Sequence, residues 1–116
     1  MKLLTKEILS KVHSLYADEG GGDPLIVAKY FDPIGSYTFY MLEYDPEERI
    51  AFGYVTGLQY DEYGSVSLAE WEDLAKARGR MGLGIERDIH FPINEHRISD
   101  VTQRRVQEWK MISVGY

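Results

Sequence analysis

Apolar and polar positions alternate, or β-branched and aromatic residues form short runs, through much of the first half of the chain. This pattern predicts strands at residues 25–31, 36–44 and 49–56. Between them, residues 32–35 and 45–48 contain proline after aspartate, which is typical of turns. Because short turns join successive strands, we expect an antiparallel meander.

Capping signals and helical spacing mark three further segments. Thr5 is a suitable N-cap for a helix to about Tyr16, and Ser99 for a last helix to about Met111. Residues 67–70 form a Ser-x-x-Glu capping box, which predicts the start of another helix.

These elements define the expected fold class. Residues 57–65 are polar and rich in tyrosine, and we expect a loop or a short edge strand there. The chain is thus predicted to be a single α+β domain over residues 1–116, a small antiparallel meander of three to five strands packed with two or three helices. Residues 92–116 either belong to this domain or form a C-terminal helical extension of it.

Both faces of the predicted strands carry apolar or aromatic side chains, more than a one-sided sheet requires. One face is expected to pack on helices. The other face is a surface for a ligand, a second copy of the chain or a protein partner, or else loops and the C-terminal segment cover it. The candidates for a partner surface are tyrosines and neighbouring acidic residues: Tyr37, Tyr40, Tyr44, Tyr60, Asp61, Glu62 and Tyr63.

The formal net charge of −6 resides in the first half of the chain. Residues 1–66 hold five Lys/Arg and eleven Asp/Glu, whereas residues 67–116 hold eight of each. Such a field disfavours nucleic acid and favours a basic protein partner, unless it serves only solubility. The chain has no cysteine, which excludes disulfides and thiolate catalysis. It also lacks a long apolar run, so we expect a cytoplasmic protein without a membrane span.

The segment 85–91 contains a candidate for metal binding or acid–base chemistry. If it is an extended strand, Glu86, Asp88 and His90 lie on one face, where they could bind Mn²⁺ or Zn²⁺ or act as acid and base. Alternatively they form a polar edge in which the carboxylates pair with nearby arginines. No metal ion or cofactor is assigned on this pattern alone.

Arginines and glycines are concentrated between residues 76 and 87. Arg78, Arg80 and Arg87 are candidates for binding phosphate or single-stranded nucleic acid, because glycines allow close approach of the backbone and arginines pair with phosphate oxygens. The spacing matches neither the P-loop nor the dinucleotide-binding fingerprint. Basic residues at a helix C-terminus also serve as ordinary dipole partners.

Several short blocks occur in a recognisable order over residues 1–91. They include Met-Lys-Leu-Leu-Thr-Lys-Glu-Ile at residues 1–8, Glu-x-Asp-Pro-Glu at 43–47, and Gly-Leu-Gly-Ile-Glu-Arg-Asp-Ile-His-Phe at 82–91. The chain in this respect resembles a family of small bacterial proteins of unknown function found largely on plasmids and conjugative elements. The resemblance implies an accessory protein of a mobile genetic element, and it implies no activity, cofactor or catalytic residue.

The leading hypothesis is therefore a non-enzymatic protein that binds a host or element-encoded protein through an acidic, tyrosine-rich surface. The alternatives are a metal-dependent hydrolase or nuclease built on Glu86, Asp88 and His90, and a single-stranded nucleic-acid binder. A homodimer through the same surface is compatible with each.

Overall fold

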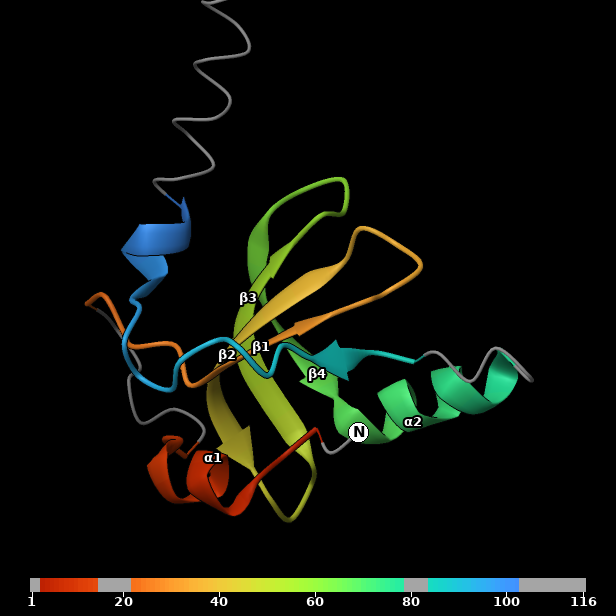
Figure 1. The fold of residues 1–116 in the computed structure, drawn as a ribbon, viewed down its shortest axis with the longest axis horizontal. Coiled ribbons are helices and arrows are strands. Elements are labelled where there is room, and N and C mark those ends of the chain that lie inside the picture. Colours follow the sequence, from red (N-terminus) through yellow and green to blue (C-terminus); the bar gives the residue numbers. More distant parts are fainter. Residues whose placement is uncertain (1–2, 15–21, 79–83, 103–116) are drawn as a thin grey trace, which may run out of the picture.

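A computed structural model describes residues 3–14, 22–78 and 84–102. Its centre is a five-stranded antiparallel sheet with the strand order β4-β3-β2-β1-β5 (Figure 1). The predicted α+β class is confirmed. Residues 98–102 are also helical. The elements in chain order are α1 (Lys6–Lys11), β1 (Ala28–Phe31), β2 (Thr38–Asp45), β3 (Ile50–Thr56), β4 (Glu62–Ser67), α2 (Leu68–Ala77) and β5 (Glu86–Arg87).

The turns and the second helix form where the sequence predicts them. In the β1–β2 turn the Gly35 N–H donates to the Asp32 carbonyl over 3.2 Å. Ser67 is the N-cap of α2, and its hydroxyl accepts a hydrogen bond from the Glu70 N–H at 3.3 Å. Local turn and capping chemistry therefore decides both boundaries.

The helix from Thr5 was predicted to reach about Tyr16, and this prediction is wrong because α1 ends at Lys11. His13 instead bridges β2, and its carbonyl accepts a hydrogen bond from the Tyr44 N–H at 2.9 Å. Pairing with the sheet thus overrides the helical periodicity of this segment.

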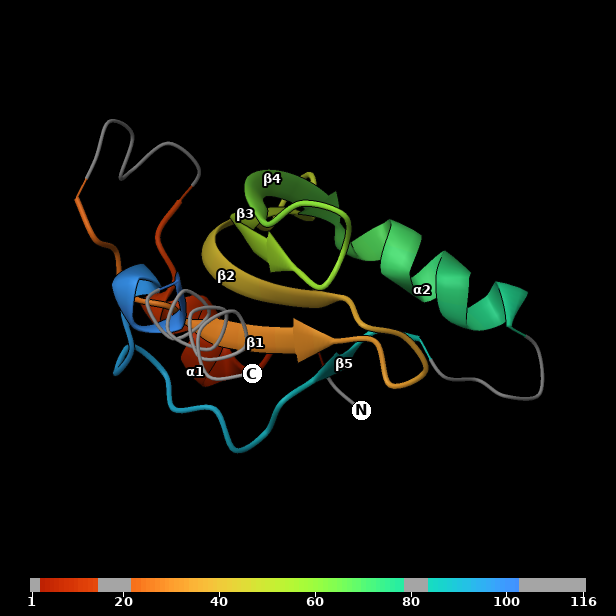
Figure 2. The same cartoon turned by 90° about the horizontal axis from the view of Figure 1, so that it is seen from above.

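The two edges of the sheet compare differently with the prediction. The short edge strand that was one alternative for residues 57–65 is present as β4, which begins at Glu62 and extends to Ser67. The strand expected over residues 85–91 is wrong in length, because β5 ends at Arg87. Beyond it the Asp88 side chain accepts from the His90 N–H at 2.9 Å, and this side-chain turn ends the pairing. Figure 2 shows β4 and β5 at opposite edges of the sheet.

The main core lies between the sheet and the helices α1 and α2. Trp71 of α2 packs on the sheet with its ring centroid 5.2 Å from that of Tyr30 and 5.6 Å from that of Phe39. Burial of such large aromatic surfaces supplies much of the folding free energy. The buried members of this cluster are Ile8, Val27, Ala28, Tyr30, Phe39, Met41, Tyr44, Ala51, Val55, Leu68, Trp71 and Ile85.

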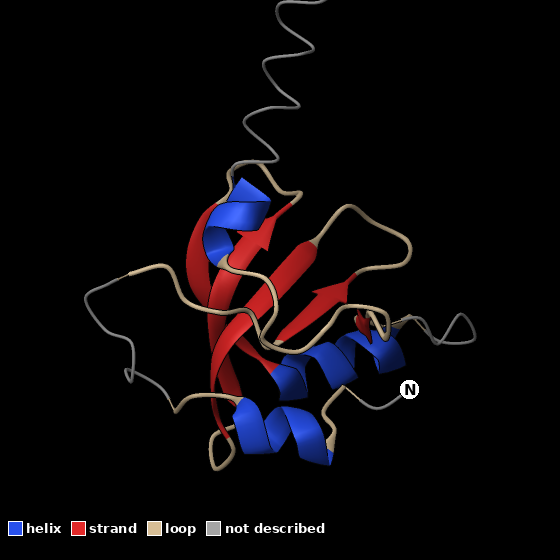
Figure 3. Cartoon of the chain, turned by 60° about the vertical axis from the view of Figure 1, so that its left-hand side comes forward, coloured by secondary structure: helices blue, strands red, loops and turns tan. Residues whose placement is uncertain are grey.

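A second, smaller cluster covers part of the opposite face. A register shift between Met41 and Glu43 leaves Leu42 as an extra residue in β2, where it packs with Ile26 and Ile98. Figure 3 shows the helical residues 98–102 away from α1 and α2. The C-terminal part of the described chain therefore covers one end of this face, as one of the sequence hypotheses proposed.

Candidate interaction surface

Three aromatic side chains contact one another on the face of the sheet opposite α1 and α2. Tyr54 of β3 lies opposite Tyr63 of β4, and their rings meet edge to face with centroids 5.1 Å apart. The Phe52 and Tyr63 rings are stacked at 6.0 Å, with 10° between their planes. We call Phe52, Tyr54 and Tyr63 the aromatic triplet. Its outermost member, Tyr63, is 51% exposed, whereas Phe52 and Tyr54 are half-buried and pack against the smaller cluster around Ile26, Leu42 and Ile98. The triplet therefore extends from the edge of that cluster to the surface.

The β3–β4 loop adds apolar and acidic groups beside the triplet. Leu58 and Tyr60 are 59% and 69% exposed, and the exposed Asp61 and Glu62 lead directly into Tyr63. Large apolar side chains with acidic neighbours are therefore presented together on one hairpin.

The start of the β3–β4 loop is fixed to the β1–β2 turn. The Ser36 hydroxyl donates to the Gly57 carbonyl oxygen. Gly57 has a φ of +86°, and a Cβ at this position would overlap the Ser36 carbonyl. Glycine is thus required both for the backbone conformation and for the close approach of the two hairpins.

The same face continues toward β1 through Tyr40, which lies opposite Tyr54 in the β2–β3 pairing. Its ring is 6.2 Å from that of Phe91, and the Lys29 ammonium lies 5.8 Å from its centroid. Lys29 also lies 3.8 Å from the Asp88 carboxylate. This end of the face is half-buried and charge-balanced, in contrast to the acidic end at β4.

The predicted partner tyrosines do not all lie on one surface. Tyr40, Tyr60 and Tyr63 belong to the aromatic face or its adjoining loop. Tyr44 is only 3% exposed and lies in the main core, so its assignment to a partner surface is wrong. Tyr37 packs edge to face on Trp71 at 6.4 Å, and its burial raises the pKa of Tyr37 to about 12.

Glu86, Asp88 and His90 do not share one extended strand. The Asp88 N–H still donates to the Lys29 carbonyl over 2.8 Å, but the turn in which the Asp88 side chain accepts from the His90 N–H takes His90 out of the sheet. Glu86 lies opposite Phe31 in β5, whereas Asp88 holds its own turn and faces Lys29. His90 is exposed. Within the described part of the chain, no three His, Asp or Glu side chains are grouped closely enough to bind a metal ion.

The arginine candidates that the structure describes, Arg78 and Arg87, do not come together in a phosphate site. Arg78 makes two hydrogen bonds of 2.9 Å to the two carboxylate oxygens of Asp32, and this contact lowers the pKa of Asp32. Arg87 lies in β5 opposite Tyr30. Arg80 lies outside the described residues. The Arg78 guanidinium therefore anchors α2 to the β1–β2 turn.

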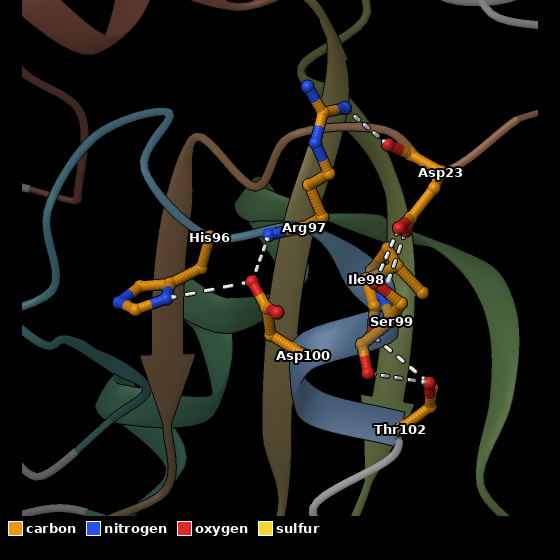
Figure 4. Close-up of polar contacts among 7 residues, drawn as sticks. All are labelled: Asp23, His96, Arg97, Ile98, Ser99, Asp100 and Thr102. Atoms are coloured by element: carbon orange, nitrogen blue, oxygen red, sulfur yellow. Dashed lines mark hydrogen bonds and ion pairs between the residues drawn. The ribbon is translucent and has the colours of Figure 1, made fainter.

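A polar cluster joins Asp23, which precedes β1, to the helical residues 98–102 (Figure 4). The Asp23 carboxylate accepts hydrogen bonds from both the N–H and the hydroxyl of Ser99, and these bonds lower the pKa of Asp23. The Arg97 guanidinium donates to the Asp23 carbonyl over 2.7 Å, and the Arg97 N–H donates to Asp100 over 2.8 Å. The contacts of Asp23, Arg97 and Ser99 serve capping and chain pairing, so this part of the cluster has a structural role.

Sequence reasoning missed Phe52 and Tyr54 as surface candidates. The signal was present, because both residues alternate with Ala51, Gly53 and Val55 along β3. Their exposure depends on which face the helices cover, however, and alternation alone does not determine that face.

The fold and this surface define a small α+β protein whose sheet presents aromatic side chains on the face away from its helices. A family model described as a protein of unknown function (DUF2958) matches residues 3–108, and the chain belongs to this family. The predicted membership of a family of unknown function is thereby confirmed. No curated protein and no solved structure matches the chain significantly. Among the described residues, no helix is long and apolar enough to cross a membrane.

Proposed function

We propose that the protein is a non-enzymatic interaction module that binds a basic protein partner through the aromatic triplet and the acidic β3–β4 loop. The observation that carries the proposal is the exposure of Tyr60 and Tyr63 on either side of Asp61 and Glu62. Tyrosine gives a large amphipathic contact at low conformational cost, and acidic neighbours attract a basic surface.

The cellular setting forms a further part of the proposal. The similarity of the blocks over residues 1–91 to proteins carried by plasmids and conjugative elements supports an accessory role for a mobile element. Its partner would then be a host or element-encoded protein in the cytoplasm. The net charge of −6 favours a basic protein over nucleic acid.

Capture from nuclease-treated host lysate, compared between matched variants, tests this function. The test variant is Asp61→Asn/Glu62→Gln, and the control is Glu47→Gln/Glu48→Gln, which removes the same charge from the exposed β2–β3 turn. We expect the wild type and the control to retain a stoichiometric basic protein that the test variant loses. We also expect capture to weaken as salt rises to about 0.5 M.

Equal capture by both variants would overturn the proposed surface, as would binding that is independent of salt. Retention of single-stranded nucleic acid in untreated lysate, lost on Tyr63→Ala, would instead favour the nucleic-acid hypothesis. In that case the stacked Phe52 and Tyr63 rings would serve as a platform for bases.

A further inference from the structure

β4 is an edge strand with few features that prevent another strand from pairing with it. Within the described residues, its backbone ladder is formed with β3 alone. Its sequence, Glu-Tyr-Gly-Ser-Val-Ser, contains no proline and no lysine, and its register with β3 is regular. Natural edge strands are commonly protected by such residues, by bulges or by shortness. The opposite edge, β5, fits that rule because it is two residues long.

The hydrogen-bond register identifies which groups are available at this edge. The Leu68 N–H donates to the Arg49 carbonyl over 3.0 Å, which fixes the phase of the antiparallel ladder. Alternate residues of β4 therefore direct their N–H and C=O groups away from β3, and these include Tyr63 and Ser65. Both residues are exposed, and their side chains lie on the face of the aromatic triplet.

We propose that β4 binds an extended segment of the protein partner by strand addition, with Tyr63 and Ser65 supplying the backbone hydrogen bonds. The inference rests on the proposed function, whose partner it describes more closely. An added strand would place alternate side chains beside Tyr63 on the aromatic face. Asp61, directly before β4, and Glu62, its first residue, favour lysine or arginine in that segment over a second copy of this acidic chain.

The test uses selection from a random decapeptide display library against the purified protein. We expect the selected peptides to share an alternation of β-branched residues with lysine or arginine. Ser65→Pro removes an outward N–H, which edge strands tolerate, and should weaken peptide binding by about tenfold or more. Ser65→Thr keeps the N–H and should bind as the wild type does.

A second arm keeps the test valid if Ser65→Pro does not fold. Two versions of a selected peptide are compared, one N-methylated at its odd positions and the other at its even positions. Only one version should lose binding to the wild type, because only one set of peptide amides faces β4. Strand addition is overturned if no peptide is selected or if both methylated peptides lose binding equally. It is also overturned if Ser65→Pro folds and binds the peptide as the wild type does. If Ser65→Pro retains the captured lysate partner while Asp61→Asn/Glu62→Gln loses it, strand addition fails and the interaction function stands.

Discussion

Individual residues hold the two hairpins of the sheet in place. Gly57 combines a positive φ with close approach to the Ser36 carbonyl, and Asp32 connects the β1–β2 turn to α2 through Arg78. Neither contact is local in sequence, since Ser36 and Gly57 are 21 residues apart and Asp32 and Arg78 are 46 apart. Sequence reasoning identified the proline turn around Asp32, but it could not identify these long-range partners.

Gly57→Ala should destabilise the protein by at least about 2 kcal/mol, because alanine adds left-handed backbone strain and overlaps the Ser36 carbonyl. Gly64→Ala is the matched control, since a Cβ there meets nothing within 4 Å. It should be neutral or stabilise by about 0.5 kcal/mol through the unfolded state. Urea unfolding measures both, and equal free energies of unfolding would refute the role of Gly57.

Asp32→Asn should destabilise the protein more than Glu7→Gln, which breaks the exposed pair between Glu7 and Lys11. Because Arg78 lowers the pKa of Asp32, its contribution is present above the ordinary aspartate pKa and is lost as pH falls through the lowered value. The difference between wild type and Asp32→Asn should therefore shrink below about pH 4. A difference that stays constant from pH 7 to pH 3 would contradict this account.

At the level of elements, the sequence was most informative where the deciding interactions are local. The Pro-containing turns and the Ser67 capping box lie within four residues of the groups they satisfy, and the predicted turns and the helix start are confirmed. The missed boundaries depend on tertiary pairing. Thus α1 ends early because His13 joins β2, and β5 is short because Asp88 forms a turn beside Lys29.

Ser67→Ala tests the local rule for α2. Loss of the hydroxyl that accepts from the Glu70 N–H should cost about 1 kcal/mol of folding free energy. Ser65→Ala, two residues earlier in the same strand, is the control because Ser65 is exposed and lies outside the cap. Urea unfolding that gives the two variants equal stability would show that the cap does not fix the start of α2.

The prediction that Ser99 is the N-cap of the last helix is wrong, because the helical residues begin at Ile98 and the Ser99 N–H donates to the Asp23 carboxylate. The predicted continuation to Met111 lies outside the described residues.

Asp23→Ala tests this long-range cap of residues 98–102. Removing the carboxylate leaves the Ser99 N–H without its acceptor, so amide exchange at Ser99 should quicken several-fold. Acidification should likewise reduce the protection of the Ser99 amide in the wild type, measured against the intrinsic exchange rate at each pH, once pH falls through the lowered pKa of Asp23. Asp100→Ala removes the acceptor of the Arg97 N–H and the partner of His96, and it should affect Ser99 less. Equal exchange in wild type and Asp23→Ala would rule out this cap.

At the scale of the whole molecule, the two faces of the sheet have different roles. The helices cover one face with a continuous core, whereas the other face is covered at the β2 end and open at β4. The sequence predicted apolar residues on both faces and an excess of acid in the first half. It could not distinguish buried Tyr44 from exposed Tyr63, because that difference depends on helix placement and sheet order.

The central claim is that the open end of this sheet binds a basic protein. The most direct measurement is the change in amide chemical shifts of the isotope-labelled protein on titration with the captured partner. We predict the largest changes at residues 52–54 and 58–65, with little change along α2. Changes concentrated on α2 or around His90, with the aromatic triplet unaffected, would contradict this assignment of the binding surface.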